Sequence, residues 1–158
     1  MMRAVVTGLV LLGSLLPSVA SGKPSPGDFG VGIVAGEPSG LSGKVFVDDV
    51  HAFAAGLSFS FVDDTMHVQG DYLIHLRGRL KGFEGGDWIP YFGVGGSVGV
   101  WQRKRQDDAG VSARFPGGLT VHLDALPVDL FVELAPAMLV IPETRFDLQG
   151  AIGGRYYF

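Results

Sequence analysis

The chain has 158 residues, no cysteine and a formal net charge of −4, which excludes a disulfide-stapled scaffold and a strongly basic nucleic-acid-binding protein. Glycine is frequent, at 25 residues, yet the chain is apolar, with a mean hydropathy of +0.32 and 11 phenylalanines. A disordered glycine-rich chain would be polar and poor in aromatic residues. The composition therefore predicts one ordered domain that uses glycine inside its structure.

The beginning of the chain has the pattern of a secretory signal peptide. Arg3 supplies an early positive charge, an apolar run covers residues 4–16, and small residues follow. The run is too short for a transmembrane helix, which needs about 20 apolar residues. We expect cleavage after Ala20 or Gly22, and no cysteine is present there that could carry a lipid anchor.

The remainder of the chain alternates between large apolar residues and small or polar ones, which is the period of β-strands. In HAFAAGLSFSF (51–61), Leu57 and Phe59 fall on one face, and Ser58 and Ser60 fall on the other. Turn sequences such as EPSG, GFEGGD and DALP separate the alternating segments. We predict eight strands, at residues 29–36, 40–47, 51–62, 65–77, 89–101, 110–123, 128–138 and 147–158.

The alternation does not say which face is buried. In a soluble secreted barrel that binds a ligand, the large apolar residues point inward, whereas in a membrane barrel they face lipid. The second face here consists mainly of Gly, Ala and Ser, which suits the crowded interior of a narrow barrel. We predict an all-β fold, an eight-stranded antiparallel up-and-down transmembrane β-barrel, and keep the soluble barrel as an alternative. The predicted domains are a signal peptide (1–22), a disordered leader (23–28) and the barrel (29–158).

Isolated charged and histidine residues lie on the small-residue face. Such groups must be paired inside a barrel lumen, and a tight DALP turn would place His122 opposite Asp129 and Glu133 near Arg114. Arg155 shares a face with Glu133 on the adjacent strand, so we predict a network centred on Arg114, Glu133 and Arg155. The predicted lumenal network contains Lys44, Asp71, Arg114, His122, Asp129, Glu133 and Arg155.

Aromatic residues occur where a membrane barrel has its two aromatic girdles. The rim that holds both termini, expected in the periplasm, would carry Phe29, Trp88, Tyr156 and Phe158. The other rim would carry Phe59, Phe61 and Phe146.

The signal peptide, the eight amphipathic strands and the terminal RYYF resemble small outer-membrane β-barrels related to the transmembrane domain of OmpA. Within that group, GEPSGLSGK (36–44), DLFVELAP (129–136) and GGRYYF (153–158) look like an uncharacterised subfamily from diderm bacteria. The resemblance implies a bacterial outer-membrane location, but no agreed activity. A terminal Phe after alternating apolar residues is similar to the signal that the barrel-assembly machinery reads, so Tyr156 and Phe158 are the predicted assembly signal.

Two connections carry open interpretations. The periplasmic connection at 78–88 is longer than the resemblance implies, so either the fourth strand runs past Arg79 or the connection is an insertion. The third outward loop could bind lipid-A phosphates or a host polyanion, because clustered cations favour phosphate. We favour a solvated hairpin tip there, since two aspartates cancel the charge. The candidate contact residues are Arg103, Lys104 and Arg105.

Some eight-stranded barrels are lipid-modifying enzymes, so we consider a lipid-A-modifying hydrolase as an alternative. The hairpin around Asp63–Asp64 is expected to place Ser60 directly opposite His67, and a nearby carboxylate would complete an acyl-transfer set. We favour a barrel without enzymatic activity, because a lipid hydrolase needs a nucleophile that lipid can reach. His67 and Asp71 lie four residues apart, about 13 Å along a strand, so we predict no metal site and no cofactor.

The predicted function is a structural, adhesive or envelope-integrity role for a monomer without an open pore. Eight strands leave no channel when side chains fill the lumen. The expected partners are outer-membrane lipids and, during biogenesis, the barrel-assembly machinery, but no nucleic acid. The bulky residues that point inward are Phe46, Tyr91, Trp101, Phe131 and Tyr157.

Overall fold

The computed structural model describes residues 22–62, 64–103 and 106–158, so all of the predicted signal peptide except Gly22 lies outside the described residues. No helix in these ranges is long and apolar enough to cross a membrane. The chain forms nine antiparallel strands: β1 (Phe29–Glu37), β2 (Ser39–Phe46), β3 (His51–Ser60), β4 (Thr65–His75), β5 (Gly86–Arg103), β6 (Gln106–Arg114), β7 (Gly117–Leu123), β8 (Val128–Ile141) and β9 (Arg145–Tyr157).

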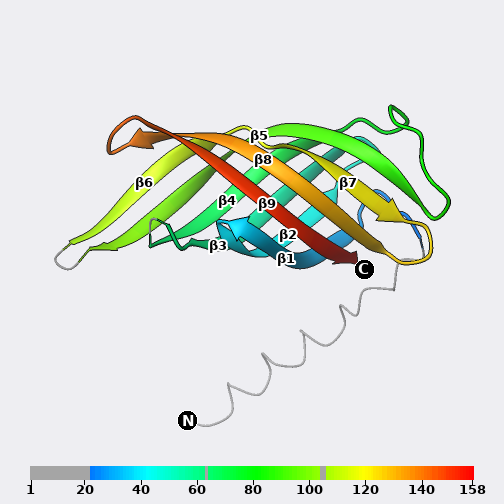
Figure 1. Ribbon diagram of the computed structural model, residues 1–158, viewed down its shortest axis with the longest axis horizontal. Helices are drawn as coiled ribbons and strands as arrows, with labels where there is room; N and C mark the ends of the chain where they lie inside the picture. Colours follow the sequence, from blue (N-terminus) through cyan, green and yellow to red (C-terminus); the bar gives the residue numbers. More distant parts are fainter. Residues whose placement is uncertain (1–21, 63, 104–105) are drawn as a thin grey trace, which may run out of the picture.

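The strands close into a ring. Consecutive strands pair with one another, except β6 and β7, β1 pairs with β9, and β5 and β8 both pair with β6 and β7. Each described strand therefore has a paired neighbour on both sides, and the sheet closes on itself. Figure 1 shows the strands winding around a common axis. This arrangement confirms the predicted all-β, antiparallel up-and-down barrel.

The predicted strand at 110–123 appears as two strands, β6 and β7, that occupy one position in the ring. Arg114 of β6 lies opposite Gly95 of β5, and Gly117 of β7 lies opposite Phe92, which is the same register. Pro116 lies between them and has no N–H to donate to the ladder. The interruption is local, so the barrel has the eight strand positions that the sequence predicts.

The two ends of the ring differ in what they hold. We call the end where β1 begins and β9 ends the terminal end, and the opposite end, with the β5–β6 and β8–β9 turns, the far end (Figure 1). The connection between His75 and Gly86 also lies at the terminal end. β4 stops at His75, so this connection is an insertion and not a longer fourth strand. β5 begins three residues earlier than predicted and includes Trp88.

The large apolar side chains face away from the ring. Ile33 is 68% exposed and Ile152 is 61% exposed, whereas Lys44 is 1% exposed and Asp129 is fully buried. This distribution is the reverse of a soluble barrel, in which apolar side chains fill the interior. The other exposed apolar side chains on the strands include Val31, Leu41, Phe53, Leu57, Val68, Val98, Leu130, Leu134, Val140 and Leu148.

The densest packing lies in the half of the lumen next to the terminal end. Phe46, Tyr91, Phe131 and Tyr157 form one buried cluster together with Ala52 and Leu73. Gly153 makes room for this cluster, because a Cβ at that position would lie 2.5 Å from the Phe131 ring.

Candidate functional site

The predicted lumenal residues form two separate groups. The group nearer the terminal end, here called the basal cluster, surrounds the buried Asp129 carboxylate. Lys44 Nζ donates a hydrogen bond to Asp129 Oδ2 at 2.8 Å, and the Tyr157 hydroxyl donates to the same oxygen at 2.7 Å. Arg155 Nη1 lies 3.5 Å from this oxygen, and His122 Nε2 lies 4.0 Å from it. One carboxylate therefore balances several donors in a dry environment.

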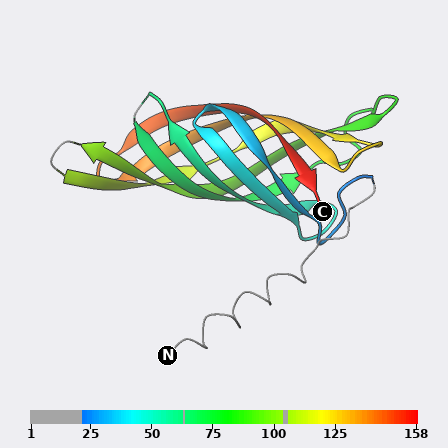
Figure 2. The same ribbon diagram turned by 90° about the horizontal axis from the view of Figure 1, so that it is seen from below.

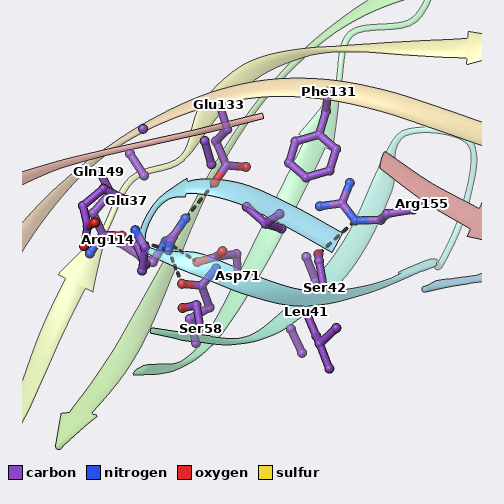
Figure 3. A pocket seen from close by; sticks show the side chains of 18 residues that line it. Glu37, Leu41, Ser42, Ser58, Asp71, Arg114, Phe131, Glu133, Gln149 and Arg155 are labelled. Atoms are coloured by element: carbon purple, nitrogen blue, oxygen red, sulfur yellow. Dashed lines mark hydrogen bonds and ion pairs between the residues drawn. The ribbon is translucent and has the colours of Figure 1, made fainter. Parts of the chain in front are cut away.

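The second group, here called the central network, surrounds Arg114. Its Nη2 donates to Glu133 Oε1 at 2.7 Å, and its Nε lies 3.1 Å from Asp71 Oδ1. Its Nη1 donates to Gln69 Oε1 at 2.5 Å and to Gln149 Oε1 at 3.0 Å. Figure 3 shows Arg114 reaching into this group from the lumenal wall. The guanidinium is thus compensated by two carboxylates on different strands.

The predicted contact between Arg155 and Glu133 is absent from the described contacts. Arg155 lies directly opposite Asp129 in the β8–β9 register, while Glu133 is four residues further along β8, about 13 Å away along the strand. The Arg155 guanidinium lies 3.8 Å from the centre of the Phe131 ring and its Nε donates to Ser42 Oγ at 3.0 Å. Arg155 and Glu133 share the lumenal face as predicted, but the carboxylate that Arg155 contacts is that of Asp129.

A small cavity lies between the two groups (Figure 3). Its volume is about 30 Å³, which is room for about two water molecules. Charged side chains and the Phe131 ring line it. The residues whose polar atoms or rings line it include Ser42, Ser58, Asp71, Arg114, Phe131, Glu133, Gln149 and Arg155.

A larger cavity, about 200 Å³, lies in the lumen toward the far end, and Ser60 and His67 both line it. The predicted pairing of these two residues is wrong, because Ser60 lies opposite Thr65 and His67 lies opposite Ser58. Four residues, not two, separate the paired ends of β3 and β4, which moves the register by two residues. Ser60 is only 4% exposed, and its side chain faces the lumen.

His67 and Asp71, and also His75 further along β4, lie at different depths in the lumen. His67 lines the far cavity, Asp71 contacts Arg114, and His75 Nε2 lies 3.4 Å from Lys44 Nζ. In the part of the chain that the structure describes, no group of three His, Cys, Asp or Glu side chains could hold a metal ion.

The predicted outer-loop contact falls largely outside the described residues. Lys104 and Arg105 are not described, and only the backbone of Arg103 is, where it pairs with Gln106. The predicted assembly residues are described. Tyr156 and Phe158 both project outward, with ring centres 5.0 Å apart.

Three residues were missing from the predicted lumenal network because they carry no fixed charge, although Tyr91 was expected to point inward. Tyr91 donates its hydroxyl to Glu133 Oε2 at 2.8 Å, and Gln69 and Gln149 both accept from Arg114. Each falls on the small-residue face by the alternation of its strand. A search for any hydrogen-bonding side chain on that face would have found them.

The comparisons with known proteins concern the fold. Neither a protein-family model nor a curated protein matches the chain. The crystal structure of the N-terminal β-barrel domain of Pseudomonas aeruginosa OprF is similar, with a TM-score of 0.59 and 13% sequence identity. The match covers 84% of this chain and 98% of that domain. The chain therefore shares the fold of that β-barrel domain, in agreement with the eight-stranded barrel that its sequence predicts.

Proposed function

We propose that the protein is a small integral barrel of the bacterial outer membrane with a structural, adhesive or envelope-integrity role. The observation that carries this proposal is the inverted distribution of side chains, with apolar groups outside and compensated charges inside. Such a surface is stable in lipid, where every backbone group must also be paired. A closed ring meets that requirement.

Cell fractionation and gel migration test the location. The mature protein should appear in the outer-membrane fraction and should migrate differently before and after boiling. Recovery of a folded protein in the soluble fraction without detergent would instead favour the soluble ligand-binding barrel.

The orientation follows from the same proposal, with the terminal end and both termini in the periplasm. The far-end turns then face the outside, including the turn that follows Arg103. Protease added to intact cells should cleave the β5–β6 turn and leave a tag at the mature N-terminus untouched, a position that keeps Phe158 free as the proposed assembly signal. Cleavage of the tag in intact cells would reverse the orientation.

We propose that the barrel has no open pore. Two layers of side chains across the lumen support this proposal. One is the aromatic cluster around Phe46 and Tyr157, and the other is the central network around Arg114. Liposomes that contain the protein should swell no faster in a small sugar than empty liposomes. Rapid swelling would contradict this part of the proposal.

We propose that the barrel is not an enzyme. The hydroxyl of Ser60 lies in the lumen, whereas a hydrolase of lipids needs a nucleophile that its substrate can reach. One observation favours the alternative of a lipid-A-modifying hydrolase, because Ser60 and His67 line the same cavity. Lipid-A and phospholipid substrates should remain intact with the purified protein, and hydrolysis that disappears in Ser60→Ala would establish the enzyme.

The proposed assembly signal is the outward pair of Tyr156 and Phe158, which the barrel-assembly machinery would read. Deletion of Phe158 should reduce the amount of folded barrel in the membrane more than replacement of Tyr157 does. Since the Tyr157 hydroxyl bonds to Asp129, Tyr157→Phe should assemble but be less stable. Equal assembly of the wild type and the truncated chain would contradict the signal.

A further inference from the structure

Residues 22–28, of which the sequence predicts 23–28 as a disordered leader, make specific contacts at the terminal end of the ring. The segment lies at the same end as the C-terminus in both views (Figures 1 and 2). We propose that this segment, here called the terminal strap, closes the lumen at that end by tying opposite walls of the barrel together. This inference goes beyond the proposed function and does not depend on it.

One end of the strap is fixed to the wall formed by β1 and β2. Gly27 N donates a hydrogen bond to Phe46 O at 2.8 Å. The Asp28 side chain accepts from Ser25 N at 2.7 Å, which forms a tight turn. Gly27 has a φ of 92°, a left-handed conformation that glycine adopts without strain. The turn directs the chain away from β1.

The other end of the strap is fixed to the opposite wall. Lys23 Nζ lies 2.6 Å from Asp87 Oδ2 of β5 and 3.3 Å from Asp124 Oδ1 after β7. With β6 and β7 counted as one position, three strands separate β1 from β5 in either direction around the ring. The two attachments therefore span the mouth of the barrel. Hydrogen bonds to these two aspartates raise the pKa of Lys23 above its ordinary value, so the ammonium stays charged.

The middle of the strap covers the packed half of the lumen. Pro24 is buried, and its carbonyl accepts a hydrogen bond from Arg77 Nη2 at 3.3 Å. The guanidinium of Arg77 lies 5.2 Å from the centre of the Phe46 ring. Phe46 in turn packs against His75 and Tyr157. Strap, guanidinium and aromatic layer form successive covers over the basal cluster, which keeps water from its buried charges.

The chain contains no cysteine, so a single introduced thiol can report water access under the strap. Ala52 is fully buried beside Phe46, and Ala52→Cys is the first probe. Thr120 is also fully buried, and Thr120→Cys is a nearly isosteric second probe should the first disturb packing. Each probe is labelled in the refolded full mature barrel with a small, charged thiol reagent.

Lys23→Glu should release the strap, because it places a third carboxylate beside Asp87 and Asp124. We expect the probe to react about tenfold faster, which corresponds to about 1.4 kcal/mol. The triple variant with Asp87→Lys and Asp124→Lys should restore slow labelling by reversing all three charges. Salt should act in the same direction as Lys23→Glu, because the Debye length falls to about 3 Å at 1 M.

Ala137→Cys in β8 is the control, since Ala137 is buried in the lumen opposite Arg114 of β6 and away from the strap. Its labelling rate should be the same with Lys23 or Glu at position 23. Unchanged labelling of both strap probes in Lys23→Glu would overturn the proposal. Equal acceleration of the control would also overturn it, because the substitution would then loosen the whole barrel.

Discussion

The two halves of the lumen follow the same strand alternation but are filled differently. Toward the terminal end, Phe46, Phe131 and Tyr157 pack around the basal cluster. Toward the far end, Ser60 and His67 line a cavity of about 200 Å³. Alternation thus decides which face a residue occupies, and side-chain size decides whether the space on that face is filled.

The charged side chains of the two halves also differ in their surroundings. Those in the terminal half are buried and compensated by specific partners, so their removal leaves an unbalanced charge in a dry interior. Those near the far end, such as Asp147, are exposed to water. Substitutions in the two halves should therefore differ in their effect on stability, even when the chemical change is identical.

The largest difference is expected for removal of a carboxylate. Asp129→Ala would leave Lys44 and Arg155 without their common partner, and breaking such a buried pair costs about 3–5 kcal/mol. Asp147→Ala, in the open half, should change stability by less than about 0.5 kcal/mol. The measurement is the free energy of unfolding in urea for each refolded variant. Similar losses for both variants would contradict the distinction between the two halves.

The next effect concerns glycine in the packed half. Gly153→Ala would place a methyl group against the Phe131 ring and the Ile33 carbonyl, which should cost about 1–3 kcal/mol of overpacking. Gly70→Ala is the matched control, because a Cβ there meets no atom within 4 Å. The two variants are compared by urea unfolding. A stable Gly153→Ala barrel would show that Phe131 can move, so the layer would not be tightly packed.

A smaller effect is expected from the hydroxyl that bonds to Asp129. Tyr157→Phe keeps the buried ring but removes one of the donors to the carboxylate. The expected loss is about 1–2 kcal/mol. Ser58→Ala is the control, because Ser58 Oγ makes no hydrogen bond in the part of the chain that the structure describes, and it should be close to neutral in the same unfolding assay. A loss for Ser58→Ala as large as that for Tyr157→Phe would contradict the importance of the bond to Asp129.

The sequence predicted the fold and the lumenal face well because both depend on alternation. The short DALP turn also fixed one register, so that His122 lies opposite Asp129 as expected. The β3–β4 turn uses four residues, including Asp64 with a φ of 51°. Composition did not reveal that length, and the predicted opposition of Ser60 and His67 was therefore wrong.

Depth along the barrel axis was harder to predict than face. Glu133 and Arg155 share the lumen, but register places Arg155 opposite Asp129 and leaves Phe131 beside its guanidinium. The alternation of a single strand carries no information about this offset. The contacts of the 22–28 segment could not be predicted from the sequence either, because Lys23 forms ion pairs with two aspartates that are distant in the sequence.

The smallest expected effect lies at the terminal end, in the β2–β3 turn. Asp48 accepts hydrogen bonds from Val50 N at 2.7 Å and His51 N at 2.8 Å, and its other oxygen lies 2.7 Å from His51 Nδ1. These bonds, with the His51 side chain first, lower the pKa of Asp48 from 3.8 to about 2. Because the folded pKa is the lower one, the turn's stabilisation is complete above pH 3.8 and is lost as the pH falls through about 2.

An NMR titration of the refolded barrel measures this turn directly. The Val50 amide resonance should hold its position from neutral pH down to about 3 and shift only near pH 2, when the acceptor becomes protonated. Asp48→Asn should remove that late shift while the resonances of β2 and β3 stay in place. A midpoint near the ordinary value of 3.8 would mean that the turn opens in solution. In that case the ordered structure at the terminal end would include the strap and the aromatic layer but not the β2–β3 turn.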